Sequence, residues 1–170
     1  MTNLGRRGLS GLIAAGGVLA VQTARAAPKE VEPRSIEKEA DAAAAYHLDF
    51  GDPKRYSQML DNARNHLAAY DYDTMALRIV FVAHAAGIKF FLKTLDGTPW
   101  AGETLDPDFV ARLNGIAAFG LQVLLCRLTF EKNNIPLDQA RTEAWIQSVP
   151  SGIATVSALQ NKGFSYIKIG

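Results

Sequence analysis

The sequence contains a single cysteine, Cys126, among its 170 residues. One cysteine cannot form an internal disulfide, so no disulfide framework holds the fold together. A lone thiol has two interpretations. It is either a small apolar residue in the core, or a reactive group that serves as a nucleophile or a sulfur carrier. The function of the protein depends on which interpretation applies to Cys126.

Several motifs of enzymes and metal sites are also missing. The chain has no Gly-x-Gly-x-x-Gly, no Gly-x-Ser-x-Gly and no phosphate-binding loop with lysine, which argues against a dinucleotide enzyme, a serine hydrolase and an NTPase. Its three histidines, His47, His66 and His84, show no metal-ligand spacing. We therefore predict no metal site and no organic cofactor. We interpret His47 and His66 as structural, and leave His84 open between a structural and a functional role.

The charge is nearly balanced, with 18 basic and 17 acidic residues and a formal net charge of +1. The chain also has no block of basic residues. A nucleic-acid partner usually requires a clustered positive charge. We therefore expect no nucleic acid as a partner.

The first 26 residues have the pattern of an export signal. Arg6 and Arg7 precede an apolar, glycine- and alanine-rich segment at 9–21, and a small-x-small cleavage pattern follows at 24–26. The apolar segment is too short to span a bilayer, which needs about 20 apolar residues. The arginine pair resembles a twin-arginine signal, and an ordinary secretory signal is the alternative. We predict export to the periplasm, and no membrane span once the signal is removed.

Cleavage after Ala26 would leave 144 residues, the size of one domain. The signal holds three arginines and no acidic residue, so the remainder has 15 basic and 17 acidic residues and a net charge of −2. Residues 27–44 are charged and then alanine-rich, which is typical of a solvated lead-in. The domain itself is expected over 45–170.

Strand and helix patterns alternate along this domain. Helices are expected to begin at Asp52-Pro53, Asp106-Pro107 and Pro150-Ser151, with shorter helical turns near 129 and over 137–141. The expected strands are 46–50, 77–83, 121–126, 145–149 and 164–169. The alternation predicts an α/β domain with a mainly parallel sheet of about five strands and helices on both faces. The strand order cannot be read from the sequence.

Candidate site residues lie where the predicted strands end, because ligands of α/β sheets bind at the carboxyl ends of the strands. His84 and Cys126 are both in such positions. Arg127 could lower the pKa of the thiol, although neighbouring residues of a strand point to opposite faces. Ser151 and Gly152 could offer backbone N–H groups to an anion, or form an ordinary helix N-cap.

The connection over 85–102 is long for a compact domain and contains the apolar segment 87–92. This segment must pack either against its own domain or against another subunit. Self-association is therefore one of our hypotheses.

Several stretches together resemble the DsrE/DsrF-like family of sulfur-relay proteins, in the family's order. The most specific are the Cys126-x-x-Thr129 strand end and the C-terminal combination of Val149-Pro150-Ser151-Gly152 with Gly163-Phe164-x-Tyr166. The other matching stretches are Tyr46–Pro53, Asn62–Leu67, Val80–Ile88 and the stretch from Leu113 through Gly120 and Val123 that leads to Cys126.

This resemblance implies a three-layer α/β/α domain that assembles into trimers or hexamers. It also implies that Cys126 receives sulfur as a persulfide and passes it on. The chain departs from the family pattern at two places. Arg127-Leu128 stands where an asparagine is frequent, and Ala85 follows the strand-end histidine where a glycine is frequent.

The leading hypothesis is a periplasmic protein that carries or binds sulfane sulfur on Cys126. His84, Arg127, Ser151 and Gly152 would line the site, and a small sulfur species or a donor or acceptor protein would be its partner. The alternative is a non-catalytic ligand-binding or oligomeric assembly module in which the cysteine is structural.

Overall fold

The computed structural model describes residues 26–170, in which five strands form one sheet with only parallel pairings. The strand order is β4-β3-β2-β1-β5. The predicted cleavage site borders this part of the chain, and the signal before it lies outside the described residues. The strands are β1 (Ala42–Leu48), β2 (Leu77–Ala83), β3 (Gln122–Cys126), β4 (Ile146–Val149) and β5 (Ser165–Lys168). The predicted parallel sheet of five strands is confirmed.

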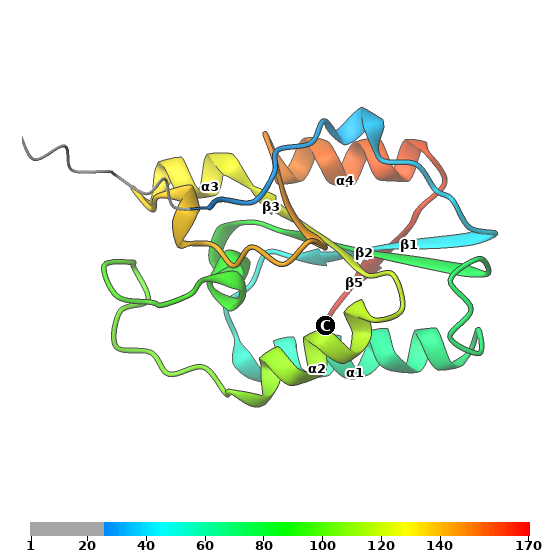
Figure 1. Cartoon of the computed structure of the whole chain (residues 1–170), viewed down its shortest axis with the longest axis horizontal. Coiled ribbons are helices and arrows are strands. Elements are labelled where there is room, and N and C mark those ends of the chain that lie inside the picture. Colours follow the sequence, from blue (N-terminus) through cyan, green and yellow to red (C-terminus); the bar gives the residue numbers. More distant parts are fainter. Residues whose placement is uncertain (1–25) are drawn as a thin grey trace, which may run out of the picture.

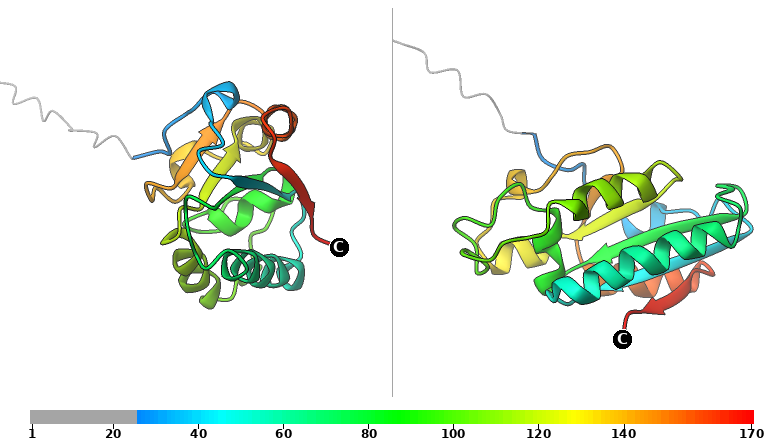
Figure 2. Two further views of the ribbon diagram at one scale, coloured as in Figure 1. Left: turned by 90° about the vertical axis from the view of Figure 1, so that its right-hand side faces the viewer. Right: turned by 90° about the horizontal axis from the view of Figure 1, so that it is seen from below.

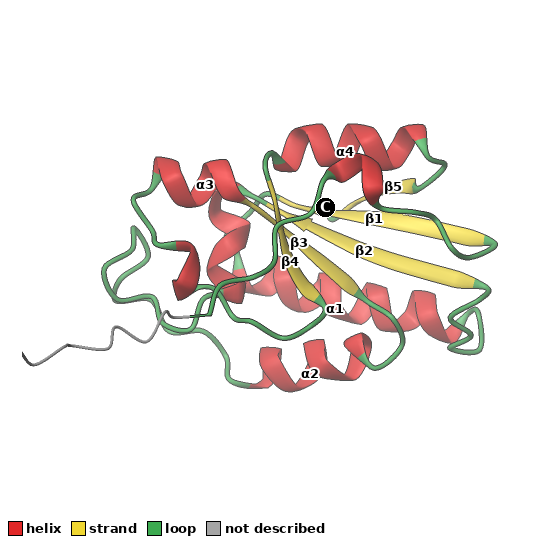
Figure 3. Ribbon diagram, turned by 45° about the horizontal axis from the view of Figure 1, so that its top comes forward, coloured by secondary structure: helices red, strands yellow, loops and turns green. Residues whose placement is uncertain are grey.

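Helices cover both faces of this sheet and complete a three-layer α/β/α fold (Figures 1 and 2). The helices α1 (Pro53–Ala68) and α2 (Asp108–Ala117) lie side by side on one face, and α4 (Gly152–Asn161) lies on the other. The short helix α3 (Arg127–Lys132) continues directly from β3 at the end of the sheet (Figure 3). Three short 3-10 segments are η1 (Pro33–Ser35), η2 (Ala85–Phe91) and η3 (Leu137–Gln139). None of the helices described is long and apolar enough to cross a membrane.

The central strand β2 has the bounds predicted from its apolar run. Alternate side chains of β2 enter two separate hydrophobic clusters, one on each face. Phe81 packs in the larger cluster beneath α1 and α2, and Val80 and Val82 pack in the smaller cluster beneath α4. A strand that is buried on both faces needs apolar residues at every position, which explains its continuous apolar run.

The predicted helix starts are observed, with one difference of detail. Asp52 caps α1 by accepting a hydrogen bond from the backbone N–H of Arg55 at 2.8 Å. After the second Asp-Pro pair the helix begins one residue later, at Asp108 rather than at the proline, because the carboxylate of Asp106 accepts from the N–H of Asp108 before α2 begins. Gly120 follows α2 with a φ of 80°, a left-handed conformation that glycine adopts without strain.

The apolar connection packs against its own domain. Phe90 in η2 stacks on Tyr56 of α1, with ring centroids 3.9 Å apart and planes inclined by 5°. Phe91 is fully buried in the same cluster. The buried Lys89 forms an ion pair with Glu103. Of the two alternatives for this segment, the structure supports packing within the domain, so its apolar character does not require another subunit.

Residues 27–44 are more ordered than the solvated lead-in that we expected. The N–H of Val31 donates to the carbonyl of Ser148 in β4, and the N–H of Ser148 donates back to the carbonyl of Lys29, each at 2.9 Å. These bonds form a short parallel bridge at β4. Ile36 is only 4% exposed and belongs to the cluster beneath α4. Strand β1 also begins at Ala42, before the predicted domain boundary. Alanine is a poor strand former, so pairing with β2 decides the local structure here, against propensity.

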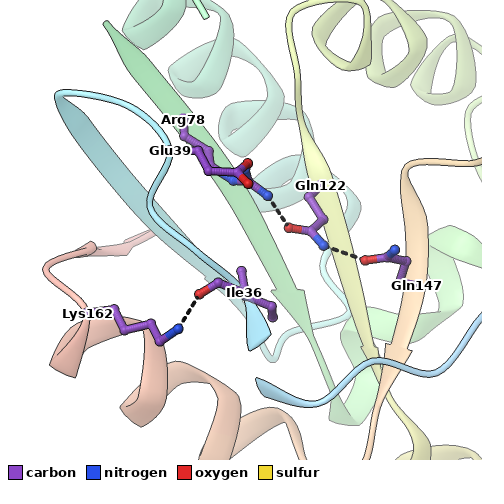
Figure 4. A network of polar contacts seen from close by, with 6 residues as sticks. All are labelled: Ile36, Glu39, Arg78, Gln122, Gln147 and Lys162. Carbon is purple, nitrogen blue, oxygen red and sulfur yellow. Dashed lines mark hydrogen bonds and ion pairs between the residues drawn. The ribbon is translucent and has the colours of Figure 1, made fainter. Parts of the chain in front are cut away.

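A row of polar side chains crosses the amino-terminal ends of β2, β3 and β4 (Figure 4). Arg78 contacts Glu39 of the lead-in and donates to the side-chain oxygen of Gln122 at 2.9 Å, and Gln122 donates to Gln147. Charged and amide groups that are partly buried are stable when they are paired in this way. The row therefore ties the lead-in to the end of the sheet that lies away from the predicted site.

His66 of α1 provides a test of the packing between this helix and the sheet. Its Nδ1 lies 3.1 Å from the Tyr46 hydroxyl, and burial lowers its pKa below the ordinary value. The unfolded chain therefore binds a proton at His66 more readily, so stability is fully present above about pH 6.5 and falls as the pH decreases. We predict that His66→Gln loses less stability than the wild type between pH 7 and pH 5 in urea denaturation. Parallel stability curves for the two proteins would contradict the prediction.

Candidate functional site

The parallel register brings the carboxyl ends of four strands to one edge of the sheet. Leu48 of β1 pairs with Ala83 of β2, and Ala83 pairs with Leu125 of β3. Cys126, the next residue, pairs with Val149 of β4. The residues that immediately follow these positions therefore share this edge, as expected for the ligand-binding end of a parallel sheet.

Cys126 is the last residue of β3 and stands at the N-cap position of α3. It is buried, with 5% of its surface exposed, and is a free thiol. Its side chain points to the face of the sheet covered by α4, because it alternates with Leu124 and Leu124 packs in that cluster. The thiol is therefore at the predicted edge but lies just below the surface.

Gly152, the first residue of α4, lies between the side chains of Cys126 and His84. A Cβ atom at Gly152 would lie 3.0 Å from the Cβ of His84, 3.1 Å from its ring carbon Cδ2, and 3.2 Å from the Cβ of Cys126. Both side chains therefore pack against the space that the glycine leaves free. His84 and Cys126 thus lie at the same edge of the sheet, because β2 and β3 are neighbours, and Gly152 lies between them.

Thr129, the last residue of the Cys-x-x-Thr pattern, fixes the backbone next to His84. Its buried hydroxyl oxygen accepts a hydrogen bond from the backbone N–H of Ala85 at 3.1 Å. The N–H of His84 donates to the carbonyl of Leu48 at 3.0 Å, and the carbonyl of His84 accepts from Gly87 at 2.9 Å. The backbone of His84 is thus held from β1, and that of the next residue from α3.

The ring of His84 lies beside His47, at an Nε2–Nε2 distance of 2.6 Å. The other ring nitrogen of His47, Nδ1, is 2.8 Å from the Tyr166 hydroxyl. Burial lowers the pKa of His84, the charge of His47 lowers it further, and the carboxylate of Asp49 opposes both effects. His84 is therefore mainly neutral at pH 7 and can accept a proton.

His47 and Asp49 are functional candidates that the sequence analysis missed. His47 was interpreted as structural, and no metal ligands were predicted. One ligand atom each from His47, Asp49 and His84 lie within 4.8 Å of one another. The available signal was the alternation of His47 and Asp49 on one face of a strand. This alternation becomes informative only when the neighbouring strand is known to be β2, because His84 directly follows that strand.

Arg127 and Ser151 both have partners within the domain. The guanidinium of Arg127 pairs with Glu30 at 2.8 Å and with Glu131 at 2.5 Å. Ser151 caps α4, accepting from the backbone N–H of Ala154 at 3.4 Å. Of the two interpretations of Ser151, the helix cap is the one observed. Two carboxylates also neutralise the charge that was expected to act on the thiol.

Comparisons with known proteins agree with this fold. Residues 40–169 match the sequence model of the DsrE/DsrF-like family. The fold is similar to the structure of a protein of unknown function from Methanobacterium thermoautotrophicum, with a TM-score of 0.59 and 20% sequence identity. That alignment covers 75% of this chain and 98% of the other. At this identity the likeness concerns the fold alone. A comparison with curated proteins found no match.

Ala85 tests whether the turn after His84 is strained. Its φ is +48°, in the left-handed region that favours glycine. We predict that Ala85→Gly raises the free energy of unfolding by about 0.5–1 kcal/mol, because relief of this strain exceeds the added entropy of the unfolded chain. Ala86→Gly is the matched control, since Ala86 does not have a positive φ, and it should be destabilising. Equal destabilisation by both changes in urea denaturation would show that Ala85 is unstrained.

Proposed function

Because the chain belongs to the DsrE/DsrF-like family, we propose that it handles sulfane sulfur and carries it as a persulfide on Cys126. The observation that carries the proposal is the position of this thiol. The only cysteine of the chain lies at the ligand-binding edge of the sheet, against the same glycine as His84. A purely structural cysteine could occupy any buried position, whereas a sulfur carrier must be placed at such an edge.

The chemistry is a thiol exchange. Cys126 loses its proton, and the neutral imidazole of His84 is a base within the same site. The thiolate attacks a sulfane sulfur of the donor, a new S–S bond forms, the donor S–S bond breaks, and its electron pair leaves with the shortened donor. An acceptor thiolate then attacks the outer sulfur of the persulfide and releases the Cys126 thiolate. Sulfur moves without net oxidation of the protein, and the cycle requires no cofactor.

The burial of Cys126 limits which donors reach it directly. A thiol that is 5% exposed favours a small inorganic donor, or a partner protein that opens the edge. Two exposed apolar side chains stand beside the site: Leu128 is 53% exposed and Ile153 is 60% exposed. Exposed apolar side chains at a site suit contact with another protein. We include such a donor or acceptor protein in the proposal.

We also propose that the protein is periplasmic and forms a homo-oligomer. The sequence pattern of the first 26 residues supports export to the periplasm, with the twin-arginine route favoured and an ordinary secretory signal as the alternative. The family resemblance supports a homo-oligomer, either a trimer or a hexamer.

Polysulfide labelling tests the sulfur-carrier proposal. After treatment of the protein with inorganic polysulfide, intact-mass spectrometry should show the addition of sulfur to the wild type and none to Cys126→Ala. Labelling of His84→Gln should be slower by about 10-fold at pH 7, since an unassisted thiol is only a few per cent ionised there. His66→Gln is the matched control, because it removes a histidine outside the site, and it should be labelled at the wild-type rate.

The competing proposal is an assembly or ligand-binding module with a structural cysteine, which the burial of Cys126 favours. In that case the native protein would gain no sulfur from polysulfide or thiosulfate, and labelling would appear only after unfolding in urea. That result would exclude Cys126 as a sulfur carrier that small inorganic donors load directly.

Size-exclusion chromatography with light scattering tests the assembly. We predict that the protein without its first 26 residues elutes as a trimer or a hexamer. A monomer at all concentrations would contradict this part of the proposal and would leave the labelling experiment unaffected.

A further inference from the structure

Three side chains of types that bind metal ions lie together at the carboxyl ends of β1 and β2. His47 lies on β1, Asp49 follows that strand, and His84 follows β2. Asp49 and His84 extend the register in which Leu48 pairs with Ala83, so they continue one face of the parallel pair together with His47. One ligand atom from each of the three residues lies within 4.8 Å of the others.

We propose that His47, Asp49 and His84 bind a divalent transition-metal ion, and that Zn²⁺ is the ion that fits best. Two imidazole nitrogens and one carboxylate oxygen are ligands typical of catalytic zinc sites, in which a fourth position stays open. Cys126 is not one of these ligands, so the inference does not depend on the proposed sulfur chemistry.

The contact between the two imidazoles is the strongest support. Their Nε2 atoms are 2.6 Å apart. Two unprotonated nitrogens repel each other at that distance, so one ring donates its N–H to the other. A metal ion that replaced this proton would find the lone pairs of both nitrogens directed toward it. In a tetrahedral zinc site with Zn–N bonds of about 2.0–2.1 Å, the two nitrogens are roughly 3.3 Å apart. The two nitrogens would therefore have to move apart by less than about 1 Å to become two ligands of one zinc ion.

The hydroxyl of Tyr166 sets the orientation of the His47 ring. It lies 2.8 Å from Nδ1 of His47, on β5 at the edge of the sheet. When Nδ1–H donates to this oxygen, the lone pair of Nε2 is free and directed at His84. Metal-binding histidines generally donate their second N–H to a fixed acceptor in this way. The support that a metal ligand requires is thus present for His47.

The surroundings give an ion access to the site. His47 and His84 are partly buried, and Asp49 is exposed. The negative charge of Asp49 favours a cation. The positive charge of Lys168, which pairs with His47 in the register of β5, opposes one, but this side chain is exposed and its flexible stem lets the charge turn toward solvent. An ion can therefore enter from solvent, and the exposed carboxylate can adjust to complete the ligand set.

Isothermal titration with Zn²⁺ tests the proposal on untagged protein that has been treated with a chelator and dialysed. We expect one Zn²⁺ per chain. Replacing any ligand, by His47→Gln, His84→Gln or Asp49→Asn, should weaken binding by about 10-fold or more. Tyr166→Phe keeps all three ligands and should still weaken binding by about 10-fold, because it removes the acceptor for Nδ1–H.

Two control variants separate this site from other binding. His66→Gln removes a histidine outside the cluster, and Cys126→Ser removes the thiol, so both should bind Zn²⁺ as the wild type does. Binding that is not stoichiometric, binding that survives both histidine changes, or binding lost in Cys126→Ser would overturn the proposal. If a ligand variant does not fold, ¹⁵N NMR of the wild type decides. Zn²⁺ must then shift Nε2 of His47 and His84 and leave His66 unchanged, and any other pattern contradicts the site.

Discussion

The register of the parallel strands is the constraint on which the site depends. Because β1, β2, β3 and β4 run in one direction, residues that are distant in the sequence follow one another along a single edge. The turn after β2 must also bend back closely over the end of β1. A Cβ at Gly87 would lie 2.2 Å from the carbonyl oxygen of Leu48, so only glycine allows this approach. The register and this close turn together hold His84 at the centre of the edge.

His84 connects the two chemistries proposed for this edge. One side of its ring packs against Gly152, which also contacts Cys126, and its Nε2 faces His47. A neutral His84 can act as a base for the thiol or as a ligand for a metal ion, but one nitrogen cannot do both at the same time. Metal binding and the reactivity of Cys126 are therefore expected to be coupled through this side chain. Gly152 is constrained to a lesser degree, since a Cβ at that position would lie only 3.0–3.2 Å from atoms of both side chains and would require them to shift.

Much of the fold could be predicted from local patterns, and much of the site could not. The apolar run of β2 and the Asp52-Pro53 helix start each reflect short-range rules, and both appear where expected. The alanines of β1 carry no strand signal of their own, so its true start depended on pairing with β2. The cluster of His47, Asp49 and His84 likewise required the strand order, which no local pattern contains. Arg127 was predicted beside the thiol from its place in the sequence, and its pairing with Glu30 of the lead-in is a tertiary contact that sequence adjacency does not reveal.

The central claim is that Cys126 and His84 form one site across Gly152, and histidine NMR tests it most directly. The ring resonances of all three histidines can be followed while Cys126 is converted to a mixed disulfide with a methylthio group. The account predicts that the signals of His84 shift and that those of His66, on the other face of the sheet, stay in place. If the His84 signals do not move when Cys126 is fully modified, the two side chains do not share a site and the account is contradicted.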